Sequence, residues 1–129
     1  MKKLFSTIFI CTAISLSAQK QYRCYHVQEF MWNPKTGIND LPVERGEISV
    51  FKIDDAKKML VQTFEDGNSL LSPIKTETTN ASKDTIYTVI SPSNGYTYNY
   101  QVNTASHVIE VVLENGDKKT LLKKYLYKD

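Results

Sequence analysis

The sequence predicts an all-β fold, and three observations lead to this prediction. Residues 96–103 alternate strictly between two kinds of side chain, which is the two-residue period of a half-buried strand. One face of this stretch carries Tyr96, Tyr98, Tyr100 and Val102. Asn-Gly or Asp-Gly pairs, the strongest short-range hairpin signals, occur at residues 66–67, 94–95 and 115–116. No segment of the expected domain shows the 3.6-residue period of an amphipathic helix.

The chain begins with a pattern typical of a cleaved export signal. Two lysines at residues 2–3 precede a short apolar run at residues 4–16, and the segment ends in small residues at Ala18. The run is shorter than the ~20 residues that a membrane-spanning helix needs. Cys11 follows an isoleucine where lipoprotein processing requires a small residue. We therefore predict a signal peptide at residues 1–18, cleavage after Ala18 and export to the periplasm or the medium.

Removal of residues 1–18 from the 129-residue chain leaves 111 residues, which suits a single β domain at residues 19–129. The removed segment carries two of the 16 basic residues, so the remaining 14 balance the 14 acidic residues. Without a basic stripe, neither nucleic acid nor an anionic membrane surface is an expected partner. Cys24 is the single cysteine of this domain, so we expect no internal disulfide and a buried, unreactive thiol.

Residues 22–31 predict the first strand, although neither of its faces is uniformly apolar. Residues 32–46 follow as the longest irregular segment, with two prolines, two glycines and the single tryptophan. Long connections in compact domains often carry function. Two interpretations remain open. The segment is either a lid in which Trp32, Ile38 and Leu41 touch a ligand or a partner, or a hairpin loop whose Trp32 folds back onto the core.

The next three strands are expected at residues 47–53, 58–65 and 69–78, with a polar loop at residues 79–84. Short turns join them, the second of which begins at the Asp66-Gly67 pair. Pro73 has no N–H to donate to a ladder. The third of these strands should therefore lie at a sheet edge or carry a bulge.

Residues 85–91 and 96–103 are expected to pair through a two-residue turn at Asn94-Gly95. This turn would place Val89 opposite Tyr100 and Tyr87 opposite Val102. A second turn, at residues 105–106, adds a third strand ending at Glu114. The predicted core of this meander comprises Tyr87, Val89, Tyr98, Tyr100, Val102, Ile109, Val111 and Leu113. A slip by one residue would send these side chains to solvent, so the facing is well specified.

A hairpin at Asn115-Gly116 leads to the closing strand, residues 120–127, in which Leu122 and Leu126 would point inward after a two-residue turn. About eight short strands in hairpin order predict a single-domain antiparallel up-and-down meander. Such a meander forms either a small barrel or a two-sheet clam. In strand count and meander order this architecture resembles the lipocalin-type small barrels. The Gly-x-Trp signature of lipocalins is absent near the first strand, so no family residues carry over.

A transmembrane barrel is the competing interpretation of an exported eight-stranded chain. Its strands need ~9–11 residues, and most of the strands expected here are shorter. The outward faces are expected to carry Gln101, Glu110, Lys123 and Lys124 rather than a lipid-facing apolar band. We therefore expect a soluble barrel without stable membrane insertion.

The sequence contains no pattern typical of an enzyme active site. It lacks a phosphate-binding glycine loop, a nucleophile elbow and a paired acid and base at catalytic spacing. His26 and His107 lie far apart with no carboxylate at ligand spacing, so no metal or other cofactor is expected. The carboxylate pairs at residues 54–55 and 65–66 fall at turns, where Asp is favoured for local hydrogen bonding. We therefore expect a protein that is not an enzyme.

The eight tyrosines are the remaining functional signal. A tyrosine-lined lumen suits a planar or amphipathic ligand, although tyrosine is also an ordinary strand residue. One hypothesis is an exported module that binds a small apolar or aromatic ligand. The alternative is an inhibitor or accessory module that contacts another protein and has no ligand cavity. The residues expected to contact the ligand or partner are Trp32, Ile38, Leu41, Tyr96, Tyr98 and Tyr100.

Overall fold

The computed structural model describes residues 19–33, 35–39 and 41–128, so the predicted signal peptide lies outside the described residues. The described residues form ten strands and no helix. The strands are β1 (Gln19–Glu29), β2 (Trp32–Asn33), β3 (Ile38–Asn39), β4 (Val43–Asp54), β5 (Met59–Phe64), β6 (Ser69–Thr79), β7 (Thr85–Ile90), β8 (Thr97–Asn103), β9 (Val108–Asn115) and β10 (Lys118–Lys128). A search of these residues for a long apolar helix able to cross a membrane finds none.

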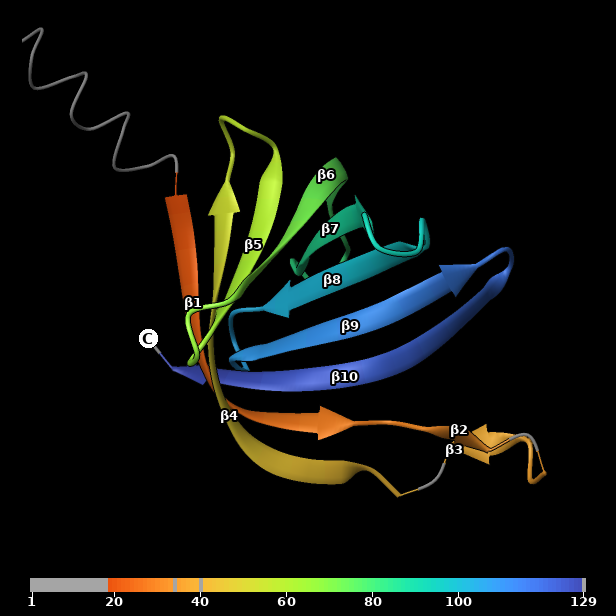
Figure 1. Ribbon diagram of the computed structural model, residues 1–129. Helices are drawn as coiled ribbons and strands as arrows, with labels where there is room; N and C mark the ends of the chain where they lie inside the picture. The colour runs from red at the N-terminus through yellow and green to blue at the C-terminus, as the bar shows by residue number, and fades with distance from the viewer. Residues whose placement is uncertain (1–18, 34, 40, 129) are drawn as a thin grey trace, which may run out of the picture.

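Eight of the strands form one closed antiparallel barrel in the order β1-β10-β9-β8-β7-β6-β5-β4 (Figure 1). Strands β4 to β10 pair with their neighbours in sequence, and β1 closes the barrel by pairing with both β10 and β4. The predicted all-β up-and-down meander is confirmed, and of the two architectures left open the chain adopts the barrel. Strands β2 and β3 form a separate hairpin between β1 and β4 that extends away from the barrel (Figure 1).

The register between β8 and β9 is the predicted one. Val102 lies opposite Ile109, and Tyr100 lies opposite Val111. All four side chains are buried. Each apolar pair therefore stacks on the inner face of the barrel, and such cross-strand pairs contribute roughly 0.2–1 kcal/mol each.

The predicted register between β7 and β8 is wrong by two residues, because the connection is a four-residue loop. Tyr87 lies opposite Tyr100 rather than Val102. The N–H of Ser91 donates to the carbonyl of Tyr96 at 2.9 Å, which leaves residues 92–95 as the loop. Pro92 has no N–H to continue the ladder, so the strand ends before it. A shift of two residues keeps every side chain on its predicted face.

A bulge in β1 explains why this strand shows no clean alternation. Its register with both neighbours shifts between Cys24 and His26, which leaves Tyr25 as the extra residue. Cys24 and Val27 are both buried, although they are three residues apart. The inward positions are therefore even-numbered before the bulge and odd-numbered after it, as expected when one residue is inserted into a ladder.

The β9–β10 hairpin turns at Gly116 and Asp117, one residue later than predicted, and Asn115 still pairs with Lys118. Gly116 has φ +62°, a left-handed conformation that glycine adopts without steric cost. A second bulge follows between Leu121 and Lys123.

This second bulge reverses the expected facing of β10. Tyr125 and Tyr127 are buried in the core, so the prediction that Leu126 points inward is wrong. Leu122 does border the lumen. Lys123, expected on the outer face, lies opposite the buried Val111 and also borders the lumen, so that prediction is wrong as well.

Several barrel strands are longer than predicted: β1, β6 and β10 have 11 residues each, and β4 has 12. β4 begins at Val43 rather than at residue 47, and the β2–β3 hairpin occupies part of the segment expected to be irregular. In β6 the ladder with β7 shifts between Ile74 and Thr76. Pro73 directly precedes this shift, which confirms the bulge expected from its missing N–H.

The buried apolar core consists of inward side chains from seven of the eight barrel strands, and β6 adds the partly buried Ile74. Of the predicted core, Tyr98 and Leu113 are half-buried and the other members are buried. The buried apolar residues that were not predicted from the meander are Cys24, Val27, Phe51, Ile53, Leu60, Tyr125 and Tyr127. Packing of this kind leaves little room in the part of the lumen that it occupies.

Candidate functional site

The two ends of the barrel differ in how far their interior is filled. The packed end carries the β4–β5, β6–β7 and β8–β9 connections, and Ile53, Leu60, Tyr87 and Tyr127 fill its interior. The cavity end carries the β5–β6, β7–β8 and β9–β10 connections and the β2–β3 hairpin. Here a cavity of about 260 Å³ enters the lumen.

The cavity wall combines apolar surface with convergent polar groups. Its apolar part includes Phe64, Leu70, Tyr98, Tyr100, Val111 and Leu122. Its polar part includes Gln62, Ser72, Ser91, Asn94, Lys123 and Tyr125. This is the composition of a small-molecule site, and its volume lies slightly below the roughly 300–1,000 Å³ of typical ligand pockets. The cavity therefore suits a molecule about the size of a single ring.

Three aromatic rings separate the cavity from the packed end. The Phe51 ring centroid lies 5.0 Å from that of Tyr125 and 5.8 Å from that of Tyr100, both in edge-to-face geometry. Burial raises the pKa of the Tyr125 hydroxyl to about 12, and it also raises the pKa of Tyr100. Both hydroxyls therefore keep their protons and can donate hydrogen bonds throughout the physiological pH range.

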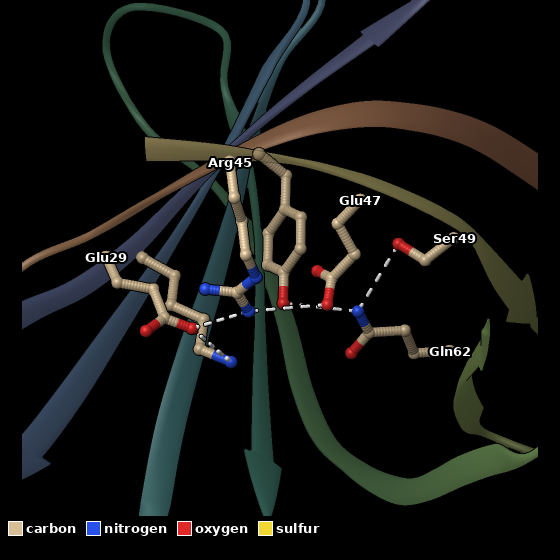
Figure 2. A network of polar contacts seen from close by, with 7 residues as sticks. Glu29, Arg45, Glu47, Ser49 and Gln62 are labelled. Carbon is tan, nitrogen blue, oxygen red and sulfur yellow. Dashed lines mark hydrogen bonds and ion pairs between the residues drawn. The ribbon is translucent and has the colours of Figure 1, made fainter. Parts of the chain in front are cut away.

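Inside the lumen, the side chain of Gln62 on β5 forms hydrogen bonds with side chains of β4 and β10 (Figure 2). Its Nε2 donates to the Tyr125 hydroxyl at 3.2 Å and to Ser49 Oγ at 3.5 Å. All three residues are buried, so the amide satisfies polar groups that would otherwise be unpaired. Gln62 lies on β5 two residues after the buried Leu60, on the same inward face.

A network of four charged side chains lies at the rim of the same end (Figure 2). Arg45 Nη2 lies 2.7 Å from Glu29 Oε1 and 3.4 Å from Glu47 Oε1, and Lys123 Nζ lies 3.6 Å from Glu29 Oε1. Arg45, through its hydrogen bond, is the largest cause that holds the pKa of Glu29 below its usual range. Glu47 Oε2 is buried and accepts no hydrogen bond from the described residues.

The β7–β8 loop shapes the opposite side of the cavity. Ser91 and Ser93 share a hydrogen bond of 2.9 Å between their hydroxyls, and Asn94 Nδ2 donates to the Tyr98 hydroxyl at 3.1 Å. Asn94 Oδ1 also accepts the N–H of Tyr96 at 2.9 Å. The asparagine predicted as a turn residue thus also fixes the position of a tyrosine in the wall.

The six residues expected to contact a ligand or partner do not all lie in one site. Tyr98 and Tyr100 line the cavity. Tyr96 is 59% exposed at the same end of the barrel, and Leu41 is 91% exposed outside the cavity. The side chains of Trp32 and Ile38 lie outside the described residues, so the lid and plug interpretations both stay predictions.

Sequence reasoning missed the polar side chains that β5 and β10 give to the cavity wall, and the charged rim of β4 beside it. Arg45, Glu47 and Ser49 share the inward face of β4 with the buried Phe51. Alternate positions from residue 45 to residue 53 change from charged to polar to apolar, and this gradient is visible in the sequence. This gradient would have indicated a strand that runs from a solvent-exposed rim into the buried core. Lys123 had no such signal, because the bulge decides its facing.

The other candidate residues have local roles. Cys24 is buried, as predicted, and burial raises the pKa of its thiol to about 12, so it is largely un-ionised at neutral pH. Asp54 Oδ1 accepts the N–H of Lys57, and Asp66 Oδ1 accepts the N–H of Asn68, as expected of turn carboxylates. A search of the described residues for groups of His, Cys, Asp and Glu that could hold a metal ion finds none.

No protein-family model, no curated protein and no solved structure matches this chain.

Proposed function

We propose that this protein is an exported binding module that holds a small aromatic molecule in the cavity end of its barrel. The observation that carries the proposal is the cavity of about 260 Å³, bounded by tyrosine and aliphatic side chains and open to solvent on one side. Concave, mostly apolar sites with a small number of placed polar groups are the usual form of small-molecule sites. The proposal assigns no chemical transformation to the site.

The proposed site of action is outside the cytoplasm, after removal of residues 1–18. The support is the lysine pair, the short apolar run and the small residues before the predicted cut. Intact-mass measurement of the protein from the periplasm or the medium of its host should give a chain that starts at Gln19. A soluble product that retains residues 1–18 would contradict this part of the proposal.

Filling the cavity tests the binding proposal. Ser72 is buried and lines the cavity from β6, so Ser72→Leu should occupy part of its volume. Native mass spectrometry of the wild-type protein from its own host should show a retained small molecule, and the variant should lose it. Ser82→Leu, the same change at an exposed position of the β6–β7 connection, should retain the molecule. Retention by the folded Ser72→Leu variant would exclude this cavity as the site.

A second candidate function is contact with another protein through the region around the β1–β4 connection. Met31, Leu41, Val43 and Ile48 are each more than half exposed there. The described β4–β5 ladder begins at Ser49, so β5 does not cover the preceding part of β4. Exposed apolar side chains beside an uncovered strand edge suit addition of a partner strand.

Site-specific photo-crosslinking in the host tests this second function. A cross-linker at position 48 should give one defined adduct with a partner protein. The same group at Ile90, an exposed residue of β7 away from β4, should not give that adduct. Equal cross-linking from both positions would indicate nonspecific contact.

A further inference from the structure

We infer that the molecule bound in this cavity is a small aromatic anion, a single ring with a carboxylate that is held by Lys123 and by tyrosine hydroxyls. The inference rests on the proposed function and adds the charge and the hydrogen-bonding class of the ligand. Four properties of the described residues support it: the charge of the cavity wall, its hydroxyl donors, the placement of its neighbouring carboxylates and its apolar surface.

The first property is charge. Lys123 is the single charged residue among the described residues that line the cavity. Its Nζ lies 3.6 Å from Glu29 Oε1, which is within ion-pair distance but longer than a hydrogen bond, whereas Arg45 approaches the same oxygen at 2.7 Å. An ammonium group has three donors. Glu29 occupies at most one of these donors, so Lys123 keeps others for a ligand.

The second property is the set of phenol donors. The Tyr98 hydroxyl accepts from Asn94, and the Tyr125 hydroxyl accepts from Gln62. The Tyr100 hydroxyl makes no hydrogen bond with the part of the chain that the structure describes. A phenol that accepts a hydrogen bond still has its own proton to donate. Three hydroxyl groups on the wall therefore can donate to an acceptor on the ligand, and a carboxylate offers two acceptor oxygens.

The third property concerns the two carboxylates nearby. Glu29 and Glu47 both contact Arg45, and neither belongs to the cavity wall. The remaining Glu47 oxygen, Oε2, is buried and accepts no hydrogen bond from the described residues. Among the residues of the cavity wall, a cationic ligand would thus meet the Lys123 ammonium group and no carboxylate, which disfavours it electrostatically.

The fourth property is the apolar surface that would hold the ring. Phe64, Leu70, Val111 and Leu122 come from four different strands and border the same cavity. Their side chains give the cavity carbon surface in addition to the Lys123 ammonium group, so a molecule that uses both has an apolar body and a charged end. Benzoate has this combination within the available volume.

Titration with three probes of similar size tests the charge of the ligand. Benzoate, benzamide and benzylamine differ mainly in carrying a negative, a neutral and a positive group. Two-dimensional ¹H–¹⁵N NMR of the full folded chain at neutral pH should show shifts at cavity residues. We expect benzoate to bind about tenfold more tightly than either other probe, since a hydrogen bond to a charged group contributes more than a neutral one.

Single-residue variants test the roles of Lys123 and of the Tyr100 hydroxyl. Lys123→Gln should weaken benzoate binding about tenfold and leave benzamide binding unchanged. Lys124→Gln is the matched control, because Lys124 neighbours Lys123 and does not line the cavity. Glu29→Gln should tighten benzoate binding several-fold, because it removes the anion that competes for Lys123. Tyr100→Phe should weaken benzoate binding without loss of the fold, which circular dichroism checks for every variant.

The outcomes separate the inference from the proposed function. If benzamide or benzylamine binds as tightly as benzoate, or if folded Lys123→Gln binds benzoate like the wild type, the inference is wrong and the binding function stands. If none of the probes shifts a cavity residue at millimolar concentration, both the inference and the single-ring binding function are wrong. Selective benzoate binding that depends on Lys123 supports both.

Discussion

The packed end and the cavity end of this barrel are built by the same strands, yet they have different interiors. Along β4 the inward side chains change from Arg45 and Glu47 at the rim, through Ser49, to Phe51 and Ile53 in the core. The packed end buries aromatic and aliphatic groups, which stabilises the fold. The cavity end leaves part of its lining without packing partners and so gives up dispersion contacts there. Under the proposed function, stability and binding are thus allotted to opposite ends of the lumen.

The largest expected effect is loss of an aromatic side chain at the packed end. Tyr87 is fully buried, so Tyr87→Ala should lower the free energy of unfolding by about 3–5 kcal/mol. Tyr98 is half-buried in the cavity wall, so Tyr98→Ala should cost about 1 kcal/mol. Urea denaturation of the two variants measures both changes. Equal losses would mean that the two ends do not differ in packing.

Alkaline pH should destabilise the folded state through buried acids. Cys24 has a pKa raised from 9.0 to about 12, so the folded protein keeps a proton that the unfolded chain releases over this range. Its contribution is fully present below pH 9 and is lost as pH rises toward 12, at about 1.4 kcal/mol per pH unit. Tyr125 acts in the same direction, with a pKa raised from 10.0 to about 12.

The matched control for this pH effect is Cys24→Ala. The variant should lose less stability between pH 9 and pH 11 than the wild type, because one of the buried acids is gone. Unfolding curves at four pH values across that interval measure the slope. An unchanged slope would show that the Cys24 thiol does not contribute to alkaline unfolding.

Removal of single hydroxyl groups should have opposite effects at the two ends. The Tyr87 hydroxyl is buried and makes no hydrogen bond of regular geometry with the described residues. Burial raises its pKa most, and the nearby Tyr22 hydroxyl raises it further through charge and a hydrogen-bond interaction. Tyr87→Phe should therefore raise the free energy of unfolding by about 1 kcal/mol. Tyr125→Phe removes the acceptor of Gln62 and should lower it by a similar amount. Thermal denaturation of both variants settles the signs, and a loss in both would mean that Tyr87 has a partner.

The smallest expected effect concerns the charged rim. The Arg45 side chain is 43% exposed, so its ion pairs with Glu29 and Glu47 are screened by solvent. Arg45→Gln should change the free energy of unfolding by less than about 1 kcal/mol. Urea denaturation at low and at high salt measures it. A loss comparable to that of Tyr87→Ala would show that the rim, and not only the packed end, holds the barrel together.

The outward face supplies a check on the facing assignment. Asn99 lies on β8 between two inward tyrosines, and its side chain joins Thr88 and Glu114 on the neighbouring strands. Loss of these half-buried hydrogen bonds in Asn99→Ala should cost on the order of 1 kcal/mol. This loss of free energy of unfolding is larger than that of a typical surface substitution and smaller than that expected for Tyr87→Ala.

The alternation of residues 96–103 by itself determined the inward face of β8 and its partner in β9, because a two-residue period permits one facing and a slip would expose it. The glycine and asparagine turn signals likewise determined that the chain runs as a meander, although the β7–β8 loop and the β9–β10 turn differ in length or position from the prediction. Local chemistry limits where a chain can turn, but neighbouring strands select the register.

Only the tertiary structure decided which residues form the site. The bulges near Tyr25 and Leu122 invert the facing of β1 and β10, and they bring Val27, Tyr125 and Lys123 into the lumen. A bulge depends on how one ladder accommodates its two neighbours when a barrel closes, and that information is not present in the period of any single strand. The cavity wall joins Gln62 to Tyr125 across 63 positions of the chain for the same reason. Closure of the sheet, rather than spacing in the sequence, sets which side chains meet inside it.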